Sequence, residues 1–310
     1  MRVILAQPRG FCAGVERAIA IVEKALEVHG APLYVRHEIV HNRWVVDSLR
    51  QKGAVFVDEL DAVPDGGTVI FSAHGVSKAV VQEGQRRPLR VLDATCPLVE
   101  KVHRQAVRLN SEGFRVILIG HPGHPEVEGT LGQLPPGNME VISNERDASD
   151  LPENPNKQVA FITQTTLSLD ETAEVVKRLR QRFPKIRAPA REDICYATQN
   201  RQNAVKALAK RCDLILVLGA PNSSNSNRLR EVAEREGTQA FLIESADDVH
   251  EAWFDQVETL GITAGASAPE ILVEELLTRL GTASQEVELL SITEENLVFP
   301  LPRELARPFT

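Results

Sequence analysis

Short apolar runs alternate with amphipathic segments along almost the whole chain. The runs have the length of strands and are rich in valine, isoleucine and leucine, at residues 3–6, 54–57, 69–72, 116–120, 159–163, 214–219 and 260–263. Such continuous runs are typical of strands buried on both faces, as in parallel sheets. Between them, apolar side chains recur at helical spacing, as over residues 15–26 before Gly30 and 98–109 before Gly113. The alternation predicts the α/β class.

Two capping motifs predict where helices begin. Ser168 stands three residues before Glu171, and Ser267 stands three residues before Glu270, with Pro269 between them. A serine followed at this spacing by a glutamate is the sequence mark of a helix start, and proline is favoured in the first turn. We therefore expect one helix to begin at each motif.

The buried runs end in small or hydrogen-bonding residues directly before a helix. Five such loops read FSAHGVS, LIGHPGHPE, FITQTTLS, VLGAPNSSNSN and ITAGASAPE. In open α/β sheets, ligands bind outside the carboxyl ends of the strands. The functional site is therefore expected on these five loops.

The length of 310 residues predicts two or three domains. Cys12, Cys96 and Cys195 are separated by nearly equal gaps, which favours three α/β units with mostly parallel sheets. We expect these units at residues 1–96, 97–194 and 195–282. An extended tail is expected at residues 283–310, packed on the body.

Composition and charge exclude several classes of protein. Hydrophobic residues make up 43% and charged residues 25% of the chain, as in an ordinary globular protein. The formal charge of -8 argues against a nucleic-acid binder. The N-terminal apolar stretch is too short for a signal peptide, and no run approaches the roughly eighteen apolar residues of a membrane span. We expect a cytoplasmic protein with a small-molecule ligand, and neither nucleic acid nor membrane as partner.

Three of the four cysteines lie in loops that are rich in glycine, proline and polar residues. Cys12, Cys96 and Cys195 stand in PRGFCAG, LDATCPLV and EDICYATQN. A reducing compartment leaves such thiols free for metal binding or catalysis. Three thiolates that meet in a three-part fold suit a 4Fe–4S cluster with one iron open to substrate. The alternative is three unrelated core residues, since free cysteine is often buried. Cys212, beside a buried strand, is interpreted as structural.

The loop HPGHPEVEG follows a buried strand and concentrates groups that exchange protons. It contains His121, His124, Glu126 and Glu128. Histidine and glutamate can relay protons near neutral pH when their surroundings adjust their pKa values. The alternatives are a solvated polar loop and a zinc hydrolase. Zinc is disfavoured because Pro122 and Pro125 break the helical spacing of the usual zinc motif.

Other polar groups suit an anion. The start of one expected helix carries Asn222, Ser223, Ser224, Asn225, Ser226 and Asn227, and a helix N-terminus attracts phosphate. The same residues are also what helix caps prefer. Ser267 can likewise be interpreted as a helix cap, as a phosphate ligand, or as both. His41 and His74 each follow an apolar run, where a lone histidine is usually structural, and Gln164, Thr165 and Thr166 add neutral donors.

Together, these segments resemble the 4-hydroxy-3-methylbut-2-enyl diphosphate reductase family. The resemblance rests on PRGFCAGV, YVRHEIVHN, FSAHGVS, DATCPLV, GHPGHPEVEGT, TQTTLS, DICYATQNRQ, NSSNSNRL and TAGASAP, in the family's order from residue 1 to about 300. It implies a trefoil of three α/β units around a central 4Fe–4S cluster held by Cys12, Cys96 and Cys195. It also implies a reaction in which the open iron takes the substrate hydroxyl. Two electrons and protons then remove that hydroxyl as water, giving isopentenyl or dimethylallyl diphosphate.

The resemblance also assigns roles to residues. Glu126 would donate the proton, with Thr165 and His124 in its relay. The diphosphate would be held by His41, His74, His124, Thr165, Ser223, Ser224, Asn225 and Ser267. A flavodoxin or ferredoxin would supply the electrons. Two further hypotheses are a non-catalytic diphosphate or iron–sulfur sensor, which has no use for Glu126, and an aconitase-like hydratase, which consumes no reductant.

Overall fold

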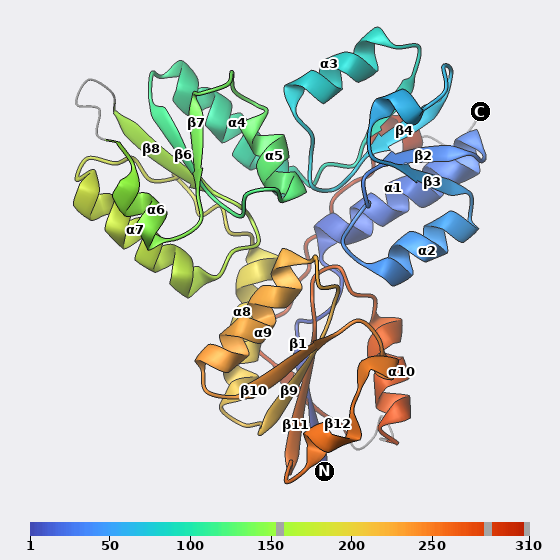
Figure 1. Cartoon of the computed structure of the whole chain (residues 1–310). Coiled ribbons are helices and arrows are strands. Elements are labelled where there is room, and N and C mark those ends of the chain that lie inside the picture. The colour runs from blue at the N-terminus through green and yellow to red at the C-terminus, as the bar shows by residue number, and fades with distance from the viewer. Residues whose placement is uncertain (153–157, 282–286, 307–310) are drawn as a thin grey trace. The chain divides into compact units, whose positions relative to one another are not determined.

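The computed structural model describes residues 1–152, 158–281 and 287–306. Within them, twelve strands form three sheets, and every strand pairing in these sheets is parallel (Figure 1). The predicted α/β class with parallel sheets is confirmed. The chain divides into two compact units. The first holds Met1–Glu16, His41–Asp47 and Tyr196–Val298, and the second holds Arg17–Val40, Ser48–Cys195 and Phe299–Thr310.

The first unit is built on a sheet of five strands in the order β10-β9-β11-β1-β12. The strands are β1 (Arg2–Gln7), β9 (Leu214–Leu218), β10 (Gln239–Ile243), β11 (Thr259–Ala264) and β12 (Val287–Ser291). Its helices are α8 (Tyr196–Ala209), α9 (Ser224–Arg235) and α10 (Glu270–Arg279), with short 3₁₀ turns at Ala246–Asp248 and Glu251–Phe254. The first strand of the chain thus pairs with strands near its C-terminal end.

Strand β9 is apolar throughout because both of its faces are covered. Leu214, Leu216 and Leu218 of β9 pack in one hydrophobic cluster with side chains of α10. Ile215 and Val217 pack in a second cluster with side chains of α8 and α9. Alternate residues of a strand point to opposite faces, so burial on both sides requires a continuous apolar run.

The second unit contains the other two sheets. One has the order β3-β2-β4-β5 and the other the order β7-β6-β8. Their strands are β2 (Leu33–Arg36), β3 (Ala54–Val57), β4 (Thr68–Phe71), β5 (Arg90–Asp93), β6 (Arg115–Ile119), β7 (Met139–Ile142) and β8 (Val159–Thr163). Helices α3 (Lys78–Arg86), α4 (Pro97–Ser111), α5 (Pro125–Leu131), α6 (Glu145–Asp150), α7 (Leu169–Arg182) and α11 (Arg303–Ala306), and a 3₁₀ turn at Leu60–Ala62, lie within this unit.

Strand β6 is covered on both faces in the same manner as β9. Ile117 and Ile119 pack in a cluster with side chains of α6 and α7. Val116 and Leu118 pack in another cluster with side chains of α4 and α5. Helices α1 (Ala13–His29) and α2 (Arg43–Gln51) each begin in the first unit and continue into the second.

The two predicted helix starts have different outcomes. Ser168 is the N-cap of α7, and its Oγ accepts from the Glu171 N–H at 3.3 Å, so this prediction is confirmed. The prediction at Ser267 is wrong, because α10 begins at Glu270 with Pro269 as its N-cap. The Ser267 hydroxyl donates to the His41 carbonyl instead, at 2.9 Å. It is therefore engaged with another loop and does not cap the helix.

The predicted domain boundaries stay a prediction. The boundary between residues 282 and 283 lies outside the described residues. In the described part of the expected tail, β12 pairs with β1, and no regular structure follows until α11. None of the helices within 1–152, 158–281 and 287–306 is long and apolar enough to cross a membrane.

Candidate functional site

Cys96 and Cys195 both lie in the second unit, on loops fixed by backbone hydrogen bonds. Cys96 is the N-cap of α4, and its N–H donates to the Ala73 carbonyl at 3.0 Å. The Cys195 N–H donates to the Thr165 carbonyl at 3.0 Å. Both residues are half-buried, and all four cysteines are free thiols. Two of the predicted metal ligands are thus held beside loops that follow β4 and β8.

Glu126 has a buried carboxyl group in this unit. It lies on α5, directly after β6, and is only 3% exposed. Its Oε1 accepts from the Thr165 N–H at 2.7 Å, and its Oε2 is 2.9 Å from the donating Thr165 Oγ1. Thr165 is itself 4% exposed and supplies the carbonyl that holds Cys195. The predicted acid is therefore connected to a predicted metal ligand through Thr165 alone.

Burial raises the pKa of Glu126 to about 7, against the two Thr165 hydrogen bonds, which lower it; the charge of Asp193 adds to the rise. A carboxyl group with this pKa carries a proton over much of the physiological range. It can give that proton to a leaving group at neutral pH, which an ordinary glutamate cannot do.

The raised pKa predicts a pH-dependent stability of the metal-free protein. A group whose pKa is higher in the folded state stabilises the fold below its unfolded pKa and loses that contribution as pH rises through the folded pKa. From pH 4.5 to about 7, wild type should lose roughly 3 kcal/mol relative to Glu126→Gln, at about 1.4 kcal/mol per pKa unit. Urea unfolding of both proteins at several pH values measures this, and a constant difference would contradict the raised pKa.

Two predicted histidines meet in the same unit. The rings of His74 and His124 lie edge to face with centroids 5.8 Å apart. His124 is the N-cap of α5, and its Nδ1 accepts from the Glu126 N–H at 3.1 Å. A neutral ring that accepts at Nδ1 carries its proton on Nε2 and can donate from there. The hydroxyl of Ser72 lies 3.3 Å from His74 Nδ1 and orients that ring.

The second unit therefore joins six predicted residues in one chain of contacts. Cys96 contacts Ala73, beside His74; His74 contacts His124; and His124 contacts the backbone of Glu126. Glu126 contacts Thr165, which contacts Cys195. His74, His124 and Thr165 follow the carboxyl ends of β4, β6 and β8, where an α/β sheet is expected to place its site. Cys96 follows β5, and Cys195 directly precedes α8.

Cys12 lies in the first unit, in a loop between β1 and α1. Its N–H donates to the Ala266 carbonyl at 3.2 Å, and the Gly10 N–H donates to the Ala264 carbonyl at 3.0 Å. Gly10 has φ of +66°, and a side chain there would meet the Ala268 carbonyl at 3.2 Å. The loop therefore follows the end of β11 so closely that only glycine suits this position.

The predicted anion-binding residues of the first unit are joined by hydrogen bonds. Ser223 is the N-cap of α9, with Ser224 and Asn225 in the first turn. Asn225 is 3% exposed, and its Oδ1 accepts from the Ala266 N–H at 2.9 Å. Asn222 Nδ2 lies 3.3 Å from His41 Nδ1, and Ser267 donates to the His41 carbonyl. The residues predicted on three separate loops of this unit are thus brought together.

Two further buried residues support these loops: Ser226, which the sequence offered only as one of the polar residues at the helix start, and Asp193, which was not predicted. Ser226 is fully buried, its hydroxyl donates to Ser223 Oγ at 3.0 Å, and both Gly219 and Gly265 pack against it. Asp193 has a fully buried carboxyl group whose Oδ2 accepts from the Thr163 N–H at 3.2 Å. The position of Asp193, two residues before Cys195, was the only available sign of its role.

The remaining candidates lie apart from these contacts. Glu128 is exposed, and the His121 N–H donates to Gln164 Oε1 at 3.0 Å. Cys212 packs in the core of the first unit, where burial raises the pKa of its thiol to about 11. Within the described ranges, no three His, Cys, Asp or Glu side chains form a preassembled metal site.

A buried acid with a raised pKa, beside a cysteine-bearing loop at the carboxyl ends of parallel strands, is typical of an enzyme that acts on a small molecule. A protein-family model described as LytB protein matches residues 3–281. The chain therefore belongs to the LytB family.

Two proteins with high sequence identity to this chain carry the same name. A protein of Magnetococcus marinus is 68% identical over 98% of this chain and 99% of its own length, and one of Acinetobacter baylyi is 58% identical over 98% of both. Both are named 4-hydroxy-3-methylbut-2-enyl diphosphate reductase. The solved structure of the Plasmodium falciparum E-1-hydroxy-2-methyl-but-2-enyl-4-diphosphate reductase has a TM-score of 0.95 at 36% identity, over 98% of this chain and 96% of that one.

Proposed function

We propose that this chain is a 4-hydroxy-3-methylbut-2-enyl diphosphate reductase. The reaction breaks the bond between the terminal carbon and its hydroxyl oxygen. Two electrons and two protons enter, and the hydroxyl leaves as water, giving isopentenyl or dimethylallyl diphosphate. The observation that carries this proposal is Glu126, a buried carboxyl group whose pKa is raised to about 7. A sensor that only binds a ligand has no use for such an acid.

We assign Cys12, Cys96 and Cys195 as the ligands of one 4Fe–4S cluster. The three residues fit this role because they are half-buried free thiols directly before the helices α1, α4 and α8, whereas Cys212 is packed in a core. When bound, such a cluster supplies electrons and, at an iron without a protein ligand, a Lewis acid for the hydroxyl oxygen. Free thiols also suit the reducing cytoplasm, where we place the protein. A flavodoxin or ferredoxin is the proposed electron donor.

Glu126 is assigned as the proton donor to the departing hydroxyl. Thr165 holds its carboxyl group from two sides, through its N–H and its hydroxyl. The Thr165 hydroxyl can pass a proton because a hydroxyl group both donates and accepts. His124 fixes the backbone of Glu126 through Nδ1, which places the proton of the neutral ring on Nε2.

The diphosphate is assigned to the polar loops of the first unit together with His74 and His124. The start of α9 offers backbone N–H groups and the positive end of a helix dipole, and the Ser223, Ser224 and Asn225 side chains stand there. Ser267 and His41 are joined to each other and add a hydroxyl and an imidazole. Such donors bind an anion without a high positive charge, which agrees with the acidic chain.

Replacing Ser224 by alanine should weaken diphosphate binding. The hydroxyl lies in the first turn of α9 and is half-buried, so its loss removes a hydrogen bond to the anion and leaves the core intact. We expect the dissociation constant of isopentenyl diphosphate to rise about tenfold, the usual worth of a hydrogen bond to a charged group. Calorimetric titration measures it.

Ser245→Ala is the matched control, because Ser245 caps a 3₁₀ turn elsewhere in the same unit. The dissociation constant of isopentenyl diphosphate for this variant should equal that for the parent. Equal constants for Ser224→Ala and the parent would remove Ser224 from the binding site.

A further inference from the structure

A basic residue follows each of the three proposed cluster ligands at almost the same distance along the chain. Arg17 comes five residues after Cys12, Lys101 five residues after Cys96, and Arg201 six residues after Cys195. They lie on α1, α4 and α8, the helices that begin directly after these cysteines. Each basic side chain reaches the backbone just before a different cysteine. Each of these contacts lies within one of the two units.

Arg17 holds the loop that contains Cys96. Its Nη1 donates to the Thr95 carbonyl at 3.1 Å, and its Nε donates to the Pro300 carbonyl at 2.9 Å. Thr95 directly precedes Cys96 in the chain. A guanidinium group is planar and donates in two fixed directions, so it sets the position of both carbonyl groups at once.

Lys101 holds the segment that leads to Cys195. Its Nζ donates to the Glu192 carbonyl at 2.7 Å and lies 3.2 Å from Asp193 Oδ1. The carboxyl group of Asp193 is fully buried and accepts from the Thr163 N–H through Oδ2. Asp193 thus connects the end of β8 to a side chain of the helix that follows Cys96.

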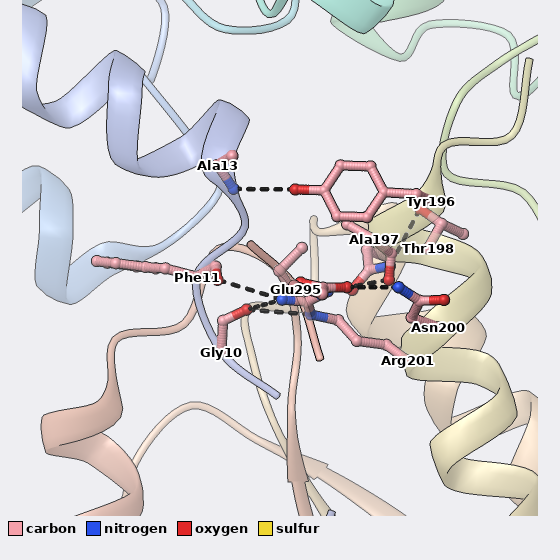
Figure 2. Close-up of polar contacts among 11 residues, drawn as sticks. Gly10, Phe11, Ala13, Tyr196, Ala197, Thr198, Asn200, Arg201 and Glu295 are labelled. Atoms are coloured by element: carbon pink, nitrogen blue, oxygen red, sulfur yellow. Dashed lines mark hydrogen bonds and ion pairs between the residues drawn. The ribbon is translucent and has the colours of Figure 1, made fainter. Parts of the chain in front are cut away.

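Arg201 holds the loop that contains Cys12 (Figure 2). Its guanidinium group is fully buried, donates to the Gly10 carbonyl at 2.8 Å and donates to the Phe11 carbonyl at 3.2 Å. Its charge is balanced by Glu295, at 3.1 Å, which also accepts from Asn200 at 2.9 Å. A fully buried arginine is uncommon and is retained only where its charge and donors are paired.

We infer that Arg17, Lys101 and Arg201 are positioning residues, each of which fixes the backbone before the next proposed ligand in a closed sequence. Arg17, after Cys12, fixes Cys96; Lys101, after Cys96, fixes Cys195; and Arg201, after Cys195, fixes Cys12. This inference rests on the proposed cluster ligands. Charge-assisted bonds to carbonyl groups are stronger than neutral ones, and residues that orient metal ligands affect how well the metal is held.

The inference is tested on the metal-free protein by the alkylation rate of each cysteine. Iodoacetamide labels folded wild type, Arg17→Gln and the Lys101→Met/Asp193→Asn double variant, and mass spectrometry follows each thiol. The double variant removes the ammonium group without leaving a buried unpaired carboxylate. Loss of a bond from a charged donor should free the loop and speed labelling about tenfold. We expect this at Cys96 alone in Arg17→Gln and at Cys195 alone in the double variant.

The direction of the change separates loop release from electrostatics. Removing a nearby positive charge disfavours the thiolate and would slow alkylation, so an increase must come from the loop. Arg17→Lys keeps a donor and should restore most of the protection of Cys96. Arg201→Gln should speed the labelling of Cys12. Because Arg201 is fully buried, its replacement also disturbs the core, so the other two variants decide the test.

Lys24→Met and Arg104→Gln are matched controls, because both residues lie on the same helices with exposed side chains. Neither should change any labelling rate. The inference is overturned if the named cysteine keeps its rate, or if all three cysteines speed up together, which is the mark of general destabilisation. Iron analysis of the reconstituted protein tests the proposed cluster independently of the labelling. Parent protein that binds no iron would refute the cluster, whereas selective labelling in the variants would still support the three contacts.

Discussion

Replacing Cys96 by serine should abolish or cripple the iron–sulfur cluster. Parent protein purified without oxygen should be brown and carry about four irons and four sulfides per chain. Cys96 is half-buried at the start of α4, with its backbone held by Ala73 and Thr95 held by Arg17. A serine hydroxyl keeps the shape of the loop but is a poor ligand for iron, since thiolates are what such clusters take. Cys12→Ser and Cys195→Ser should have the same effect.

Cys212→Ser is the control for general loss of a thiol. Cys212 packs in a core cluster, and burial raises its pKa to about 11, so it stays protonated and cannot readily serve as a thiolate ligand. This variant should keep its iron, although a hydroxyl in the core will lower its stability. Equal iron loss in Cys212→Ser, or full iron in Cys96→Ser, would show that the ligand set is wrong.

Replacing Glu126 by glutamine should lower turnover at least about a hundredfold, the usual cost of losing a general acid. The amide keeps the shape and can still accept from the Thr165 N–H and donate to its hydroxyl, so the site stays intact. The amide has no acidic proton that it could donate to the departing hydroxyl. Steady-state kinetics at neutral pH should show a lower kcat with a nearly unchanged KM, because binding of the diphosphate does not involve this group.

Glu128→Gln is the matched control, since Glu128 lies on the same helix and is exposed. Its turnover should equal that of the parent. Glu126→Gln turning over within a few-fold of the parent would remove Glu126 from the mechanism.

The buried strands could be predicted because burial on both faces leaves a continuous apolar run. Each of the seven runs matches a strand to within one residue at its C-terminal end, as at β9 and β6. The strands β2, β5, β7, β10 and β12 were not predicted; all but β2 lie at sheet edges. Two of these edge strands are partly exposed: β5 exposes Arg90 and Asp93, and β12 exposes Leu289. Partial exposure breaks the apolar run that identifies a strand.

The pairing of β1 with β11 and β12 could not be predicted from local pattern. These partners are more than 250 residues away in the chain, and the register, such as Val3 with Leu260, is decided by packing. The same limit explains the error at Ser267. The serine-to-glutamate spacing is a local signal, whereas its hydroxyl is taken by the carbonyl of His41, on a distant loop.

The candidate site could be proposed from the sequence because its residue types carry chemistry by themselves. Glu126, His124 and Thr165 follow buried strands, and the carboxyl ends of parallel strands place such loops side by side. The burial that raises the pKa of Glu126 is a tertiary property and has no local sign. Arg17, Lys101 and Arg201 look like ordinary charges on amphipathic helices until their carbonyl partners are known.

The central claim is a two-electron reduction, and the ratio of electrons consumed to product formed tests it most directly. Reconstituted protein is given 4-hydroxy-3-methylbut-2-enyl diphosphate and a coloured one-electron reductant under anaerobic conditions, and products are separated by chromatography. Removing one hydroxyl as water takes two electrons and two protons, so two reductant molecules should be oxidised for each isopentenyl or dimethylallyl diphosphate formed. Substrate converted without oxidation of reductant would indicate a hydratase, and bound but unconverted substrate would indicate a sensor; either result would contradict the proposed function.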